Sequence, residues 1–108
     1  MFRVIIAGPA QKDIRSAFSW WATHRSATSA SRWYVGIVDA IYSLKSSPDR
    51  CTLAPERDLV EQPLRQLLFG LGSRPTHRIV FVVDGSDVII LAVRHAGQDL
   101  LLSDDLEQ

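Results

Sequence analysis

The sequence of 108 residues contains a single cysteine, Cys51, so no disulfide can form within the chain. A cysteine-based zinc cluster is excluded as well, and a reducing compartment fits this composition. No run approaches the ~20 apolar residues that a membrane helix needs. The opening run MFRVIIAGPA is too short for a secretory signal, because Gly8 and Pro9 interrupt it. We therefore expect a cytoplasmic protein without a membrane partner.

A dominant charge of one sign is also missing. Lys+Arg and Asp+Glu number 12 each, and the sequence pI is about 6.8. This balance excludes a strong overall attraction to nucleic acid. Ten of the 12 cations are nevertheless arginine, the residue suited to bidentate contacts with phosphate or carboxylate. The length fits one domain over residues 1–108, and the hydrophobic fraction of 46% is that of a globular protein.

Motifs of the common enzyme classes are absent. The sequence has no glycine-rich phosphate loop, no HExxH, no CxxC and no GxSxG. We expect neither a cofactor nor a metal.

Hydrophobic periodicity predicts a strand over Phe2–Ala7 and two helices, at about Pro9–His24 and Ala30–Lys45. The short polar break Arg25–Ser29 between the helices predicts an antiparallel hairpin. In the second helix the apolar residues recur at spacings of 3, 4, 4 and 3, and they are Ala30, Trp33, Ile37, Ile41 and Leu44.

Three strand-like runs follow the helices, at Leu64–Gly70, His77–Asp84 and Asp87–His95. Gly85-Ser86 joins the last two, with glycine in the first position of a type II′ turn. The prediction is an α+β fold: an N-terminal strand, an antiparallel two-helix hairpin and a three-stranded antiparallel sheet. The 15-residue connection Asp49–Pro63 has no period and is predicted to be a loop, in which Glu56 and Glu61 are solvated charges.

Regular pairing of the last two strands predicts how their side chains face. If Asp84 pairs with Asp87, Arg78 lies opposite Val93 and shares one face of the sheet with His95. Both faces are apolar in the middle, while one layer of helices can cover only one face. We therefore expect a partner segment, or a second copy of the chain, on the sheet or along the helical hairpin.

Basic side chains in or beside the strands are the candidates for chemistry. Arg65, Arg78 and Arg94 could bind a phosphodiester and stabilise its developing charge, and His95 beside Arg78 could transfer a proton. The alternative is that these are strand-end charges that reach solvent or pair with acids such as Asp58, Glu61 or Asp99. His24 at a helix end and His77 at a strand start are interpreted as structural residues.

The succession of segments resembles the RelE/ParE superfamily of bacterial type II toxins. The resemblance rests on the order of elements and on four stretches: Leu53–Glu56, Arg65–Gly70, His77–Phe81 and Ile90–Ala96. It covers nearly the whole chain. It implies a small toxin encoded beside an antitoxin that wraps it and blocks its target site.

The resemblance leaves two targets open. One branch of the superfamily is similar to ribosome-dependent endonucleases that cut mRNA with basic residues, and it implies catalytic roles for Arg65, Arg78 and His95. The other is similar to gyrase poisons without a nuclease site. Leu67 stands where the nuclease branch has a second basic residue, and the run after Ala96 offers no Tyr. We favour a ParE-like binder of DNA gyrase over an mRNA endonuclease, with a family member lacking toxicity as a third reading.

Overall fold

The computed structural model describes residues 1–97 and 101. In chain order the elements are β1 (Arg3–Ile6), α1 (Gly8–His24), α2 (Ala27–Tyr42), η1 (Ser43–Lys45), η2 (Pro48–Arg50), β2 (Thr52–Leu53), η3 (Arg57–Leu59), β3 (Arg65–Phe69), β4 (His77–Asp84) and β5 (Asp87–His95). Among the described residues, neither α1 nor α2 has the length and apolarity that a membrane span requires.

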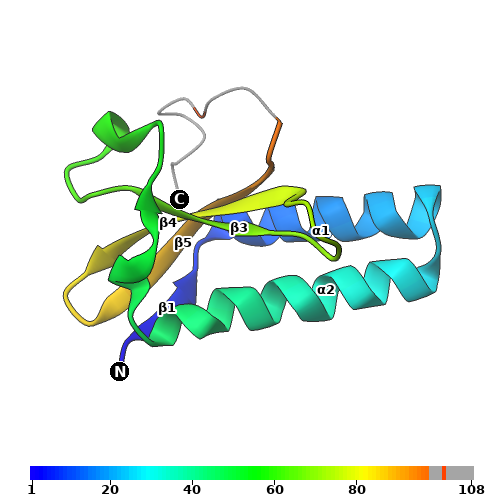
Figure 1. The fold of residues 1–108 in the computed structure, drawn as a ribbon, viewed down its shortest axis with the longest axis horizontal. Helices are drawn as coiled ribbons and strands as arrows, with labels where there is room; N and C mark the ends of the chain where they lie inside the picture. Colours follow the sequence, from blue (N-terminus) through cyan, green and yellow to red (C-terminus); the bar gives the residue numbers. More distant parts are fainter. Residues whose placement is uncertain (98–100, 102–108) are drawn as a thin grey trace.

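The strands form one sheet in the order β1-β5-β4-β3-β2. β1 runs parallel to β5, and the other neighbours are antiparallel. Figure 1 shows α1 and α2 side by side against the sheet, with the end of the hairpin projecting beyond it. The predicted α+β fold is confirmed. The short strand β2 is an addition, because it lies within the segment that was predicted to be a loop.

Local capping explains where the helices begin. α1 starts at Gly8, one residue before the predicted start, with Ala7 as its N-cap and Pro9 in the first turn. α2 starts at Ala27, three residues earlier than predicted, because the Ser26 side chain accepts a hydrogen bond of 3.0 Å from the Ser29 N–H. The polar break between the helices is correspondingly shorter.

The main core lies between the helices and the sheet. The predicted stripe of α2 is confirmed, since Trp33, Ile37 and Ile41 are fully buried in it. Trp21 of α1 is only partly buried against the same cluster. The cluster consists of Ala10, Ile14, Trp33, Ile37, Ile41, Leu44, Cys51, Ile79, Phe81, Val88, Ile90 and Val93.

A second apolar cluster covers the opposite face of the sheet. The sheet residues in it are Val80, Val82, Leu91 and Ala92, and they pack against Ala54, Leu64 and Leu101. All seven are buried. The expectation that this face stays open until a partner arrives was therefore wrong, because the connection before β3 and Leu101 cover its centre.

A register shift between β4 and β5 changes which side chains share a face. Phe81 lies opposite Ile90 and Val80 opposite Ala92, so Leu91 is the extra residue of a β-bulge. Beyond the bulge the alternation of β5 is reversed relative to regular pairing. Arg78 therefore pairs with Arg94, rather than with Val93 as predicted.

The same shift separates Arg78 from His95. His95 lies opposite His77, and the two imidazole rings are 5.4 Å apart between centroids. His77 belongs to the helix-covered side, where it contacts Trp33 of α2. Arg78 is its neighbour in the strand and faces the other way. The prediction that Arg78 and His95 share a face was wrong.

Candidate functional site

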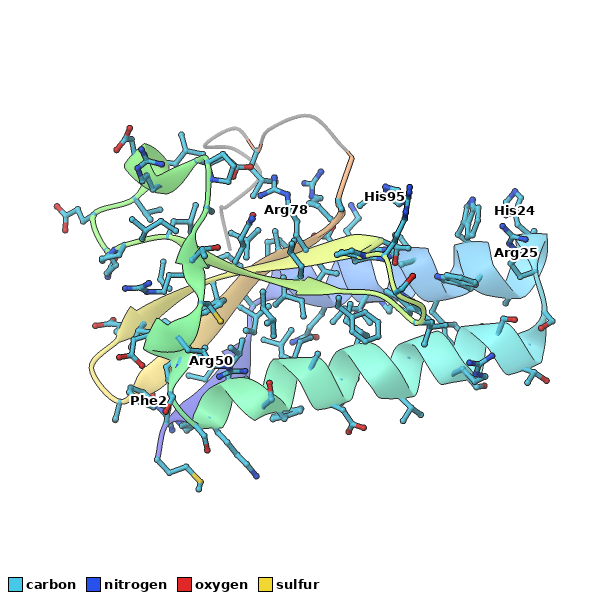
Figure 2. All side chains as sticks on the ribbon, in the orientation of Figure 1. Phe2, His24, Arg25, Arg50, Arg78 and His95 are labelled. Carbon is cyan, nitrogen blue, oxygen red and sulfur yellow. The ribbon has the colours of Figure 1, made fainter. Side chains whose placement is uncertain are left out.

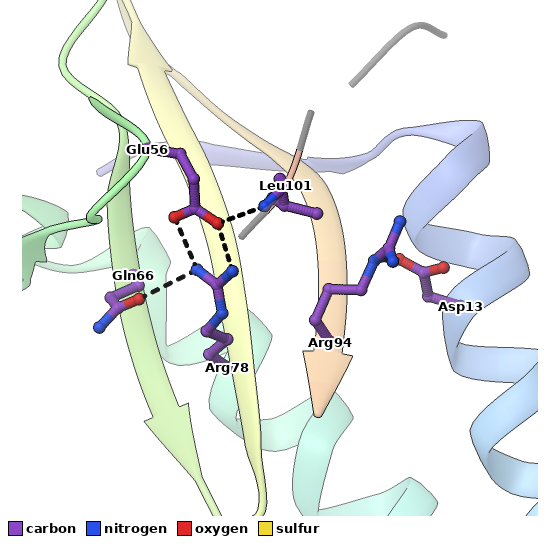
Figure 3. A network of polar contacts seen from close by, with 6 residues as sticks. All are labelled: Asp13, Glu56, Gln66, Arg78, Arg94 and Leu101. Atoms are coloured by element: carbon purple, nitrogen blue, oxygen red, sulfur yellow. Dashed lines mark hydrogen bonds and ion pairs between the residues drawn. The ribbon is translucent and has the colours of Figure 1, made fainter. Parts of the chain in front are cut away.

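Arg78 lies in a closed polar network on the second face of the sheet, drawn in Figure 3. Its residue is 5% exposed. One guanidinium nitrogen donates to Glu56 Oε1 at 2.9 Å and to Gln66 Oε1 at 3.3 Å. The other donates to Glu56 Oε2, which completes a bidentate ion pair. The Glu56 carboxylate thus occupies the two donors of Arg78 that would otherwise bind a phosphate.

Glu56 also holds the chain beyond β5. Its Oε2 accepts a hydrogen bond of 2.8 Å from the Leu101 N–H. Burial alone would raise the pKa of Glu56, but the hydrogen bonds from Arg78 and Leu101 outweigh burial and hold this pKa below its ordinary value. The prediction that Glu56 is a solvated charge was wrong, since it is the partner of Arg78 in place of Asp58 or Glu61. The third predicted partner, Asp99, lies outside the described residues.

The other candidate arginines have partners of their own. Arg65 of β3 donates to the Cys51 carbonyl oxygen at 2.7 Å, which ties β3 to the turn before β2. The Arg94 Nε lies 3.6 Å from Asp13 Oδ2 of α1, and the same carboxylate oxygen accepts from the Val93 N–H at 2.9 Å. Arg65 and Arg94 thus have partners other than Glu56 and Gln66, although Arg94 lies directly opposite Arg78 in the register of β4 and β5.

His77 is a buried histidine with a defined tautomer. Trp33 Nε1 can only donate, and it lies 3.3 Å from His77 Nδ1, so this nitrogen accepts and the proton of the neutral ring is on Nε2. Thr76 Oγ1 lies 2.8 Å from the same nitrogen. Burial, with a smaller contribution from His95, lowers the pKa of His77 to about 4. His77 is therefore neutral at neutral pH, in agreement with a structural role.

This histidine makes the fold sensitive to acid. In the unfolded chain its pKa is the ordinary 6.5, whereas in the folded chain it is about 4. The unfolded state therefore binds more protons between these values, and stability should fall as the pH drops from about 6.5 toward 4. The full loss is on the order of 3 kcal/mol. Urea unfolding at pH 7.5 and pH 4.5 checks this, and a His77→Gln variant should lose most of the difference.

A cavity of about 290 Å³ opens where α1 runs past the ends of β4 and β5. Trp20 is 47% exposed there, and it stacks on His24 with ring centroids 4.9 Å apart. In Figure 2, His95 points outward near the sheet end, and His24 and Arg25 mark the end of α1. The residues that line the cavity are Ala17, Trp20, Trp21, Arg25, Thr76, His77 and His95.

A second hollow, the hairpin groove, lies on another side of the two helices. It measures about 480 Å³ and adjoins a hollow of about 460 Å³ with which it shares Arg15 and Tyr34. Phe18 and Tyr34 meet edge to face at 5.9 Å, and Tyr42 is half exposed. The residues that line the groove are Ile6, Gln11, Ile14, Arg15, Tyr34, Val38 and Tyr42.

Reasoning from sequence alone missed Glu56, Asp13 and the cavity. The carboxylates could not be assigned, because ion-pair partners far apart in the chain leave no local pattern. The Trp20-Trp21 pair was a usable signal, since the helical period cannot place two adjacent tryptophans on one stripe.

Three comparisons bear on identity. A family model described as the ParE toxin of the type II toxin–antitoxin system parDE matches residues 4–100. A structure of the chromosomal ParDE system from P. aeruginosa aligns with a TM-score of 0.70 at 18% identity, over 88% of this chain and 96% of that one. The RelBE2 toxin–antitoxin complex from Mycobacterium tuberculosis aligns with a TM-score of 0.57 at 20% identity, over 87% and 96%. No curated protein matches in sequence. At these identities the two structures support the fold.

Proposed function

The chain belongs to the ParE toxin family of type II toxin–antitoxin systems, and from this premise we propose that it inhibits growth by binding DNA gyrase and is neutralised by a cognate antitoxin. In this proposal the protein acts by binding and breaks no bond. The target follows from the resemblance to the gyrase-poisoning branch.

The observation that carries the proposal is the pairing of Arg78 with Glu56. A ribonuclease needs positively charged groups that converge on the scissile phosphate and a nearby group that transfers protons. Arg78 is neutralised by a buried carboxylate, and His95 lies on the other side of the sheet. Arg65 faces the Cys51 carbonyl. The three residues of the nuclease hypothesis thus form no common site, which favours the binder.

The hairpin groove is the proposed antitoxin interface. Tyr34 and Tyr42 line it and Phe18 lines the adjoining hollow, and all three side chains are more than a third exposed. Such side chains dominate binding energy when a partner covers them. An amphipathic helix laid along the groove between α1 and α2 would bury them, as in other helix-in-groove complexes. The expectation that a partner lies along the helical hairpin is therefore kept. The expectation of a partner on the sheet face is withdrawn, because that face is covered.

A single exposed residue tests the target. His95→Ala tests the target through its effect on mRNA, because a binder needs no proton transfer, whereas loss of a general acid–base group typically lowers cleavage by ~10²-fold or more. Induced cells should keep intact mRNA by primer extension, and purified protein should inhibit supercoiling by gyrase. Codon-linked mRNA cuts that disappear with His95→Ala would establish the endonuclease instead. Arg78→Ala is a poor test, because it leaves Glu56 buried without its cation.

A further inference from the structure

We propose that the cavity at the end of α1 is the anchor site for the cellular target, and that it receives an aromatic side chain flanked by a carboxylate on the target protein. The inference rests on the proposed function, because it assigns a surface of the chain to the target of that proposal.

The walls of the cavity suit a flat aromatic group. Trp20 and Trp21 meet at 88° with ring centroids 5.7 Å apart, so they form two sides of a corner. His77 and His95, whose rings are in contact with each other, also line the cavity. Aromatic rings prefer stacked or edge-to-face neighbours, and this corner offers both to an inserted ring. His77 carries its proton on Nε2, so its ring can also donate to an acceptor such as a tyrosine hydroxyl.

The charges around the cavity indicate which chemical group should lie beside the inserted ring. Arg25 lies at its rim, and none of the described residues that line it is acidic. One carboxylate, Asp13, lines an adjoining hollow, where it pairs with Arg94 and accepts a hydrogen bond from the Val93 N–H. A carboxylate beside the inserted ring would therefore meet Arg25 without repulsion.

A nucleic acid fits these charges less well. A bound strand needs several cations along its backbone, and Arg25 is the only arginine among the residues that line the cavity. The neutral chain offers no general attraction to compensate. Tryptophan and arginine are instead the residues most enriched at the centres of protein interfaces.

The cavity and the hairpin groove use different faces of α1. The groove uses Gln11, Ile14 and Arg15 of this helix, whereas the cavity uses Ala17, Trp20 and Trp21. At 3.6 residues per turn the two sets are centred about a third of a turn apart. Variants of the cavity residues can therefore be tested for target binding while the groove residues stay unchanged.

The direct test titrates the full chain, labelled with ¹⁵N, with acetyl-Asp-Tyr-amide. We expect saturable shifts of the Trp20 and Trp21 indole N–H signals, with acetyl-Lys-Tyr-amide at least about tenfold weaker. Trp20→Ala and Arg25→Gln should each weaken binding by about tenfold. Arg32→Gln is the control, because Arg32 is an exposed arginine on α2 that does not line the cavity, and it should leave binding unchanged. Absent or unsaturable shifts, equal binding of the lysine peptide, or tighter binding of thymidine monophosphate would each overturn the inference.

The functional arm uses the same variants in cells and with purified gyrase. Trp20→Ala should reduce growth inhibition and supercoiling inhibition by at least about tenfold, while the product of the neighbouring antitoxin gene still copurifies. Full inhibition by Trp20→Ala would overturn the inference and leave the proposed function intact. If the parent protein spares gyrase altogether, the proposed function fails, and the peptide titration still decides whether the cavity binds its ligand.

Discussion

Trp33→Ala is expected to lower the free energy of unfolding by about 3–5 kcal/mol, the range for deleting a large aromatic side chain from a core. Trp33 is fully buried between α2 and the sheet, and its indole N–H donates to His77 Nδ1. The substitution leaves a void and also removes the donor that fixes the His77 tautomer. Since small domains are stable by only ~5–15 kcal/mol, the loss should be evident in thermal and urea unfolding.

Two other tryptophans calibrate this result. Trp21 is partly buried and Trp20 is half exposed, so the cost of replacing them by Ala should fall in that order below the cost at Trp33. Trp21 and Trp33 should therefore differ in cost, although both pack against the same apolar cluster. If Trp33→Ala melts within about two degrees of the parent, the burial described here is wrong.

The elements of this fold could be predicted from sequence because their signals are local. The stripe from Ala30 to Leu44 has the period of a helix, and its members are buried in the fold. Gly85-Ser86 indicated a type II′ turn, and Gly85 adopts a φ of 61° that glycine tolerates without strain. Helix ends were missed by one to three residues, since Ser26 competes with other polar residues of the break as a cap.

Side-chain facing at the candidate site could not be predicted in the same way. A β-bulge at Leu91 has no signature among the apolar residues around it, yet it reverses the alternation beyond it. A one-residue shift of this kind was enough to separate His95 from Arg78. Coverage of the second sheet face by Ala54, Leu64 and Leu101 was likewise invisible, because it depends on where a loop without a period folds back.

Charged partners are the hardest contacts to read from a sequence. Glu56 and Arg78 are 22 residues apart. Asp13 is 80 residues from Val93, whose backbone N–H it accepts, so only the tertiary fold brings these groups together. Composition gave equal numbers of acids and bases, which is compatible with any pairing. The resemblance to a toxin family placed Arg78 at a position of interest, while its neutralisation by Glu56 required a structure.

Glu56→Leu is expected to destabilise the protein by about 3–5 kcal/mol, as breaking a buried ion pair does when one charge stays behind. The two side chains are 2% and 6% exposed, so water cannot replace the missing carboxylate at Arg78 without opening the fold. The Leu101 N–H loses its acceptor too. Its amide should therefore exchange with solvent much faster in the variant, which hydrogen-exchange NMR measures separately from global unfolding.

A double variant at Glu56 and Arg78 separates the contribution of the ion pair to stability from the cost of leaving one charge buried alone. Glu56→Leu with Arg78→Met removes both charges and fills their buried positions with apolar side chains, so most of the lost stability should return. Arg78→Met alone should be as damaging as Glu56→Leu alone, because either leaves one buried charge. A double variant as unstable as the sum of the two would mean that the charges contribute independently. Restored stability together with unchanged growth inhibition would show that Arg78 stabilises the fold and is not needed to stabilise a scissile phosphate.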